Sequence, residues 1–546
     1  MLTPTKRFWS LLSQYNSLLK QIYIYAIFIG VINLTLPVGI QAIINFLQAG
    51  EMTSTWLVLV GFVLLGISLA GVLQVLQLRL VENIQQDLFA RSAFEFAFRL
   101  PEITLFKLDK VHAPELANRF FDTLTLQKGL PKIIIDFSLA IFQIVFGLIL
   151  LAIYSSYFIV LGMILGLILW IIFKVTGPLG LKTSMKESKY KYRLAHWLEE
   201  IARVHYSFKL FGKDGFHLNK TDNTVQDYLK SRESHFQVLL TQFWFFVGFK
   251  IVLAAGLLIL GGYLVFSERI NLGQFVAAEI IIILILNSIE KILQLVETVY
   301  DVLTGLEKIG HITDLDLDAN NGTLKLKSDA GIHIMAKNIY ASFPDDLSGI
   351  INGLSLDIKA GEKILIEGSS GSGKSLLMRL LSGVQEVNSG KLLINDIAIE
   401  NYTRSSYYQA VGIVFPTNQI FEGTIRENIE MGSKVDEAVI QDLIDVLGLN
   451  SFLNRRPKGL DTVIDSGGRR LTRSIIKKLL LARALVKKPS LLLLENPLQY
   501  LEDDEKKRII NYLCKFHADS TILVISNCEH WKNKCNRIIN ISQNQE

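Results

Sequence analysis

The sequence predicts an α-helical membrane bundle of six long helices, followed by an α/β domain with a phosphate-binding loop. Three observations predict this fold class. Half of the 546 residues are hydrophobic, and the mean hydropathy of +0.34 is high for a soluble protein. The long apolar runs lie in about the first 300 residues, as membrane spans require. A complete glycine-rich motif, Gly368–Ser375, lies in the more polar second part.

The apolar runs of the first part are long enough to cross a hydrocarbon layer about 30 Å thick. Short and long connections alternate between them, and the two long connections carry most of the cations. The positive-inside rule therefore predicts that the long connections and both termini are cytoplasmic. The predicted spans are Ile22–Phe46, Trp56–Leu76, Ile133–Ile153, Phe158–Val175, Phe243–Phe266 and Leu272–Ile292.

The remaining segments of the first part also have a predicted structure. Arg79–Arg99 and Met185–His205 keep a helical period without internal Pro or Gly, which predicts that membrane helices continue into the cytoplasm. Short helices are expected near Pro114–Thr123 and Tyr206–Phe216. We expect residues 1–20 to form an interfacial helix with Trp9 at the lipid surface, residues 21–310 the membrane domain, residues 311–332 a polar linker and residues 333–546 the α/β domain.

The glycine-rich motif has the context that a phosphate-binding loop needs. Lys363–Glu367 predicts a buried strand, and Leu376–Leu381 predicts an apolar helix directly after the loop. Glycines let backbone N–H groups turn toward phosphate oxygens at a helix N-terminus. Lys374 then supplies a positive charge for the β- and γ-phosphates, and Ser375 offers its hydroxyl to Mg²⁺. ATP and Mg²⁺ are therefore the expected ligands.

Six spans, a phosphate-binding loop and a second motif cluster about a hundred residues later resemble an ATP-binding cassette (ABC) exporter half-transporter over the whole chain. Phe421–Ile429 is similar to the F-x-G-T-I-R-E-N-I run of that family, and Ala482–Leu485 is similar to the segment after its signature motif. The resemblance implies that Phe343 stacks on adenine. It also implies a nucleotide-binding set of Gly368, Ser369, Ser370, Gly371, Ser372, Gly373, Lys374, Ser375 and Leu376.

The resemblance also implies partners and a location. The chain is expected to pair with a second half-transporter, as a homodimer or a heterodimer, in the lipid bilayer of a bacterial cytoplasmic membrane. The membrane half is most similar to peptide or protein exporters of type I secretion systems, which suggests a periplasmic adapter. The net charge of +5 is small for this length, and with six spans it argues against a nucleic-acid partner or a soluble enzyme.

The signature position departs from the family pattern L-S-G-G-Q. Counting back from Ala482, the chain has Leu471, Thr472, Arg473, Ser474 and Ile475 there. In the family, the glycines of this motif approach the γ-phosphate bound by the partner subunit. Arg473 adds a long side chain at that approach, where it either clashes or pairs with phosphate.

Four further positions are altered. Glu495 ends an apolar strand and still has the chemistry to hold Mg²⁺, but Asn496 stands where the family has its catalytic base. A neutral amide orients water but does not accept its proton. The switch histidine is replaced by Asn527, and Pro416 occupies the usual glutamine position. The fourth departure is Gln499–Glu502, in place of Ser-Ala-Leu-Asp.

These departures leave two functional hypotheses. One is an exporter subunit with weak or absent intrinsic hydrolysis, which would carry a peptide, protein, lipid or drug-like substrate. The alternative is a membrane protein that binds ATP without hydrolysing it and acts as a scaffold or regulator. Charges within the spans are costly in lipid, so Glu279 and Lys250 are candidates for lining a translocation path. Asp136 and Glu290 are expected at the interface instead.

Overall fold

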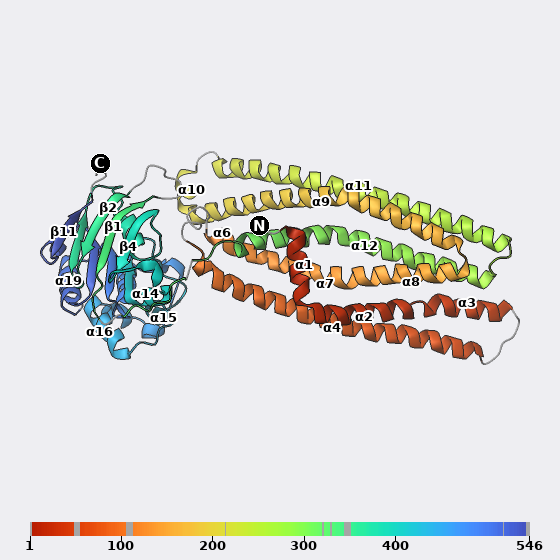
Figure 1. Ribbon diagram of the computed structural model, residues 1–546, viewed down its shortest axis with the longest axis horizontal. Coiled ribbons are helices and arrows are strands. Elements are labelled where there is room, and N and C mark those ends of the chain that lie inside the picture. The colour runs from red at the N-terminus through yellow and green to blue at the C-terminus, as the bar shows by residue number, and fades with distance from the viewer. Residues whose placement is uncertain are drawn as a thin grey trace. The chain divides into compact units, whose positions relative to one another are not determined.

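The chain folds into two compact units. The computed structural model describes residues 3–48, 55–104, 113–212, 215–318, 321–327, 330–342, 351–516 and 518–541. The helical unit comprises residues 1–101 and 112–315, and the α/β unit comprises residues 102–111 and 316–546. This division confirms the predicted order of a helical part and an α/β part (Figure 1).

The helical unit is built from long, nearly parallel helices that carry the predicted apolar runs (Figure 1). Six helical segments in the described part are long and apolar enough to cross a membrane, as expected. The helices of this unit are α1 (Pro4–Gln14), α2 (Asn16–Ile32), α3 (Thr35–Gln48), α4 (Thr55–Glu102), α6 (Ala113–Asn118), η1 (Arg119–Phe121), α7 (Asp122–Lys132), η2 (Ile133–Phe137), α8 (Ser138–Tyr154), α9 (Tyr157–Arg203), α10 (His205–Phe211), α11 (Phe216–Phe266) and α12 (Leu272–Thr313).

The helices differ from a row of simple spans in three places. The first predicted span is divided into α2 and α3, because Pro37 has no N–H to donate to a preceding carbonyl. Near Pro131 the third span contains the π-helical turn η2, and its helix starts well before the apolar run. As predicted, α4 and α9 continue far beyond their apolar parts, and α6 and α10 are the short helices expected in the long connections.

The N-terminal helix differs in its packing from an interfacial helix. Helix α1 begins after Thr3, whose side chain accepts a hydrogen bond from the Lys6 N–H, and it ends at Gln14. Trp9 is 67% exposed, but Leu12 is buried against other helices of the unit. Arg7 forms an ion pair with Asp314, just beyond the end of α12. Part of the apolar face of α1 therefore packs on protein.

Buried polar groups join α9, α11 and α12 inside the helical unit. The Gln242 amide donates to the Thr176 hydroxyl at 2.9 Å and to the Tyr300 hydroxyl at 2.8 Å. Tyr300 fits against Gly180, where an added Cβ would lie 2.3 Å from the ring. These three helices are thus held in register by hydrogen bonds as well as by apolar contacts.

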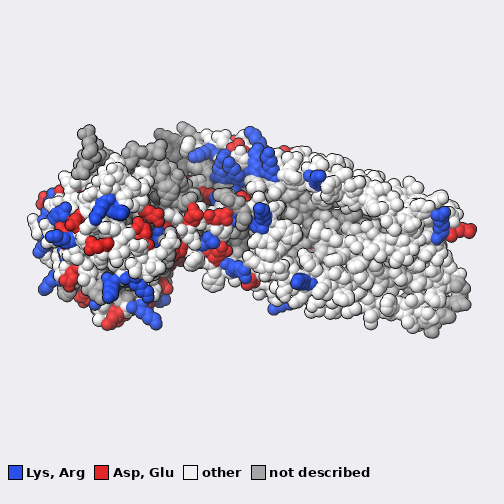
Figure 2. Space-filling model, in the orientation of Figure 1, with Lys and Arg blue, Asp and Glu red and all other residues white. Residues whose placement is uncertain are grey.

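Charged side chains are unevenly distributed on the helical unit. On the face in Figure 2, most of its surface is uncharged; most lysines, arginines and acidic residues gather toward one end, and a small charged group lies at the opposite tip. Most of the uncharged surface is made by exposed apolar side chains such as Leu64, Ile164 and Ile259. Such a surface is suited to contact with lipid, because the hydrocarbon layer shields the apolar side chains from water.

The α/β unit contains a parallel sheet, a smaller antiparallel sheet and a helical part (Figure 1). The parallel sheet has the order β11-β3-β10-β9-β6, and the antiparallel sheet has the order β2-β1-β4-β5. The strands are β1 (Ile334–Ala341), β2 (Ile351–Ile358), β3 (Lys363–Glu367), β4 (Ser389–Ile394), β5 (Ile397–Ala398), β6 (Val411–Val414), β7 (Gly423–Thr424), β8 (Val463–Ile464), β9 (Leu491–Glu495), β10 (Thr521–Ile525) and β11 (Arg537–Asn540).

Apolar strands explain why this sheet is buried. The four leucines of β9 and most of β3 and β10 are fully buried, as expected for parallel strands covered on both faces. The helices of the unit are α13 (Lys374–Leu381), η4 (Ile399–Asn401), α14 (Arg404–Ala410), α15 (Ile425–Glu430), α16 (Glu437–Leu447), α17 (Asn450–Leu453), η5 (Gly459–Asp461), η6 (Ser466–Gly468), α18 (Arg473–Leu485), α19 (Asp503–Phe516) and α20 (Glu529–Lys532).

The segment predicted as a linker is shared between the units. Helix α12 continues to Thr313, two residues past the expected start of the linker. Further on, Leu324 pairs with Tyr402, and Leu326 is buried in the core of the α/β unit. Polar composition alone did not reveal these contacts, because two apolar side chains among polar neighbours are enough to anchor a segment.

Candidate functional site

The phosphate-binding loop connects β3 to α13, as the sequence predicts. Gly371 and Gly373 have φ angles of 82° and 90°, in the left-handed region that favours glycine. At Gly368, an added Cβ would lie 2.3 Å from the carbonyl oxygen of Ile541. The loop therefore needs glycine at these three positions to turn its backbone into the N-terminus of α13.

The two functional side chains of the loop lie at its mouth. The Lys374 ammonium donates to the carbonyl oxygens of Gly368 at 2.8 Å and Ser369 at 2.6 Å. The Ser375 hydroxyl donates to Glu495 Oε1 at 2.7 Å. A hydroxyl and a carboxylate side by side are oxygen ligands of the kind that Mg²⁺ prefers, so these residues fit the expected metal ion.

Three strand ends meet beside this loop. In the parallel sheet, Ile525 of β10 pairs with Ile366 of β3 on one side and with Glu495 of β9 on the other. The segments after these strands therefore leave the sheet at the same edge. That edge brings the phosphate-binding loop, Glu495 and Asn496 together, and Asn527 follows β10 only two residues later.

Asn496 has a constrained backbone at this edge. Its φ angle is 46°, and its N–H donates to the Ile525 carbonyl at 2.8 Å. Asparagine tolerates the left-handed region better than most residues. Asn527 is exposed. Asn496 and Asn527 thus both present neutral amides at this edge of the sheet, and their correspondence to the base and the switch residue stays a prediction.

The signature position lies at the N-terminus of α18. Thr472 caps this helix by accepting a hydrogen bond from the Ile475 N–H at 3.4 Å. Arg473 donates to the Tyr500 hydroxyl at 3.1 Å, and its guanidinium lies 5.3 Å from the Tyr500 ring centroid. Tyr500 has a φ angle of 72° and is half exposed. The contact between two substituted motif positions was not predicted from the sequence.

A second cation approaches the same region. Partial burial lowers the pKa of Lys477, and the nearby Tyr500 and Glu495 oppose that shift. Lys477 is one helical turn after Arg473 on α18, so both face the segment after β9. The spacing of four residues between Arg473 and Lys477 would have indicated in the sequence that both side chains lie on one face of a helix. It did not indicate that Tyr500 and Glu495 lie next to that face.

The predicted nucleotide-binding set also includes Leu376 and Phe343. Leu376 is only 1% exposed and packs in the core beneath the loop, so its backbone alone remains for a ligand. Phe343 lies outside the described residues. At the usual glutamine position, Pro416 lies in an exposed turn closed by the hydrogen bond from the Asn418 N–H to the Phe415 carbonyl.

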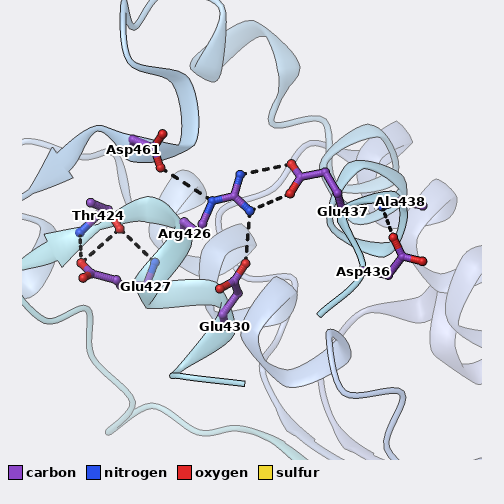
Figure 3. A network of polar contacts seen from close by, with 8 residues as sticks. All are labelled: Thr424, Arg426, Glu427, Glu430, Asp436, Glu437, Ala438 and Asp461. Atoms are coloured by element: carbon purple, nitrogen blue, oxygen red, sulfur yellow. Dashed lines mark hydrogen bonds and ion pairs between the residues drawn. The ribbon is translucent and has the colours of Figure 1, made fainter. Parts of the chain in front are cut away.

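The landmark run Phe421–Ile429 forms a polar network around Arg426 (Figure 3). The Arg426 guanidinium donates to both carboxylate oxygens of Glu437, at 2.7 and 3.1 Å, and to Glu430 at 3.2 Å. Asp461 lies 3.7 Å away. Hydrogen bonds to Glu437 raise the pKa of Arg426. The network ties α15 to α16 and to η5.

Two of the charges predicted within or near the spans form an ion pair. Lys250 on α11 donates to Glu290 Oε2 on α12 at 2.5 Å. This pairing of residues 40 positions apart was not predicted from the sequence, and the interfacial position expected for Glu290 stays a prediction. Glu279 is half-buried on α12, and Asp136 lies in the π-helical turn η2.

Comparisons with known proteins match both units. The family described as "ABC transporter transmembrane region" matches residues 21–289, and the family described as "ABC transporter" matches residues 351–499. The structure of a bacterial Atm1-family ABC exporter with ATP bound has a TM-score of 0.84 at 19% identity, covering 95% of this chain and 92% of that one. At this identity the likeness concerns the fold.

Curated relatives differ in how much they share with this chain. A glutathione/L-cysteine transport system ATP-binding/permease protein of Haemophilus influenzae is 29% identical over 195 residues, 35% of this chain and 34% of the relative. An Escherichia coli protein named for microcin-H47 secretion and processing is 24% identical over 540 residues, 96% of this chain and 75% of the relative. For several relatives, the match spans about a third to about half of their own length.

Proposed function

Because the chain belongs to the half-transporters of the ABC exporter family, we propose that it forms one half of an ATP-driven exporter in a bacterial cytoplasmic membrane. A second half-transporter, identical or different, completes the assembly. Binding of ATP brings two α/β units together, and this movement reorients the membrane helices toward export. Both termini and the α/β unit lie on the cytoplasmic side, following the cations of the long connections.

One observation carries the nucleotide-binding part of this proposal: the loop Gly368–Ser375 opens α13, and its Ser375 hydroxyl contacts Glu495. The backbone N–H groups of the loop bind the phosphates, and Lys374 turns from its carbonyl partners to the β- and γ-phosphates. Ser375 and Glu495 hold Mg²⁺, which neutralises part of the phosphate charge.

The substituted residues are the reason to propose that hydrolysis is weak. Asn496 orients a water molecule but leaves its proton in place, so the general-base contribution of about 10²–10⁴-fold is missing. Asn527 likewise has no proton to exchange near neutral pH. In an assembled pair, Leu471–Ile475 of this chain faces the nucleotide of the partner, so neither composite site keeps the full family pattern.

The names of the relatives indicate only a broad class of cargo. One relative is named for microcin secretion, one for lipid A-core flipping and one for glutathione and L-cysteine transport. We therefore propose a peptide, protein, lipid or drug-like cargo. The weak likeness to peptide exporters adds a periplasmic adapter as a candidate partner.

The test is ATP binding and turnover by the full chain in nanodiscs, with Lys374→Ala as the control. We expect ATP to bind at micromolar to millimolar concentration and turnover to exceed the control only slightly. If the wild-type chain fails to bind ATP, the proposal is wrong. Binding without any turnover above the control favours the alternative, a nucleotide-gated scaffold or regulator, since the substitutions at Asn496 and Asn527 then abolish rather than weaken hydrolysis.

A further inference from the structure

A cavity of about 440 Å³ lies in the helical unit, among the parts of α9 and α12 beyond their apolar runs. Helix α6 and the turn η1 close its third side. All of its lining residues belong to the described part of this one unit. They are Glu115, Arg119, Met185, Lys189, Tyr192, Arg193, His196, Thr304, Glu307, Lys308 and His311.

The lining carries more positive than negative charge. Four lysines and arginines stand against two glutamates, which leaves two excess positive charges with the histidines neutral. Both glutamates are already engaged. Glu115 lies 3.5 Å from Arg119, and Glu307 lies 3.8 Å from Arg7, which is outside the cavity.

The remaining cations have few partners of opposite charge. Arg193 lies 3.7 Å from Asp227 at an exposed site, and Lys308 lies 5.4 Å from the Tyr192 ring centroid. No carboxylate of the described residues lies within ion-pair distance of Lys189 or Lys308. The Arg119 side chain is only 14% exposed, and its Nε is buried without a hydrogen-bond acceptor.

This arrangement is costly without a ligand. Like charges at close range repel, and a buried donor without an acceptor loses its hydrogen bond to water. Asp122 and Glu307 offset part of the positive charge around Lys308, but Asp122 does not line the cavity, and Glu307 is shared with Arg7. The Asp122 carboxylate accepts a hydrogen bond from the Tyr192 hydroxyl, and Glu199 accepts one from the Asn118 amide. An anion in the cavity would supply the missing acceptor and the missing charge.

The position of the cavity indicates a soluble ligand. Thr304 lies about 18 Å along α12 beyond Ile292, where the apolar run ends, at about 1.5 Å per residue. Met185 lies about 15 Å along α9 beyond Val175 by the same measure. The polar layer of a bilayer is only about 5–8 Å thick on each side. A lipid headgroup would therefore not reach the cavity.

We infer that this cavity binds a water-soluble anion with at least two negative charges, carried by phosphate or carboxylate groups. Arg119, Lys189 and Lys308 are its main contacts, and they come from three separate elements. Its occupant therefore links η1, α9 and α12. The inference does not rest on the nucleotide site, because none of these residues belongs to the α/β unit.

The experiment titrates citrate and inorganic pyrophosphate, separately and without Mg²⁺, into the full chain in phosphatidylcholine nanodiscs by calorimetry. We expect saturable binding of both probes. Lys308→Gln should weaken it about tenfold, as expected for one charged hydrogen bond. Lys308→Arg should restore it. Lys186→Gln is the matched control, because Lys186 is exposed on α9 and does not line the cavity.

Three outcomes would overturn the inference. The first is that neither probe binds to the wild-type chain. The second is that pyrophosphate binding is lost in Lys374→Ala but unchanged in Lys308→Gln, which would assign it to the phosphate-binding loop. The third is that Lys308→Gln changes only the affinity of the chain for anionic phosphatidylglycerol nanodiscs, which would make the ligand a lipid headgroup. ATP binding by each variant checks that it is folded.

Discussion

Replacing Asn496 by glutamate should restore hydrolysis, because it puts a proton acceptor back beside the phosphate-binding loop. Asn496 follows Glu495, whose carboxylate already contacts the Ser375 hydroxyl. Its backbone is fixed by the hydrogen bond from its N–H to the Ile525 carbonyl at 2.8 Å. A longer side chain at this position therefore starts from a defined place at the edge of the sheet.

The size of the gain follows from two opposing effects. A positioned general base contributes about 10²–10⁴-fold to a rate, equal to about 3–5 kcal/mol of activation free energy. Against this, the φ angle of 46° suits asparagine better than glutamate, at a cost of about 1 kcal/mol in folding free energy. The altered signature and Asn527 remain, so we expect the lower end, about 10²-fold.

The assay compares ATP turnover of wild type, Asn496→Glu and Asn496→Gln in nanodiscs. Asn496→Gln is the matched control, because it adds the same length without a carboxylate. The gain should appear only in Asn496→Glu and should disappear when Lys374→Ala is added. Equal turnover of the Glu and Gln variants, with ATP binding intact in both, would show that the missing base does not limit hydrolysis.

Three further predictions concern stability and reactivity. Arg426→Ala should lower the free energy of unfolding of the α/β unit by about 1 kcal/mol, because it removes three partly exposed ion-pair contacts. The control Arg470→Ala, at a side chain that is 88% exposed, should change this free energy by less than about 0.5 kcal/mol. Thermal unfolding of the solubilised chain measures both. Equal shifts in the two variants would contradict the role of the Arg426 network. Gly180→Ala should destabilise the helical unit by about 1–3 kcal/mol, because the new methyl group would lie 2.3 Å from the Tyr300 ring. The control Gly177→Ala, with nothing within 4 Å of the new methyl group, should be neutral or stabilising in the same assay. Equal stability of the two variants would mean that the helices shift apart at no cost. Burial raises the pKa of the Cys535 thiol to about 12, so at pH 8 it should react with N-ethylmaleimide at least about 10²-fold more slowly than in the unfolded chain, and the rate should rise about tenfold per pH unit up to pH 10, as followed by mass spectrometry. A rate that levels off near pH 9 would refute the raised pKa.

Features that depend on a local pattern could be predicted from the sequence. The strand Leu491–Glu495 and the loop Gly368–Ser375 are examples, because the side chains of a few neighbouring residues determine the structure of each. The six apolar spans follow from length and composition in the same way. Pro37 also carried a local signal, but its effect on the first span was not anticipated.

Features that depend on residues far apart in the sequence could not be predicted. Arg473 and Tyr500 are 27 positions apart, and Lys250 and Glu290 are 40 positions apart. Each pair meets only because two elements pack side by side, and neither residue of a pair indicates its partner. The cavity around Lys308 depends on three elements at once, so in the sequence its excess charge was visible only as cations scattered between and after the spans.

The contact between Arg473 and Tyr500 bears on how two subunits would share hydrolysis. In the family, the signature of one subunit approaches the nucleotide of the other, and here the arginine at that position is held by a tyrosine of its own unit. To reach a phosphate, Arg473 must leave a hydrogen bond and a ring contact that are partly exposed to water, at a cost of about 1 kcal/mol. A charged hydrogen bond to phosphate offsets that cost. In the proposed assembly, the composite site that receives Arg473 would therefore still close on nucleotide, while the site that contains Asn496 would lack its base. If the second half-transporter has a complete set of motifs, the two sites would differ in kind: one would keep a base and face an altered signature, and the other would keep a signature and lack the base.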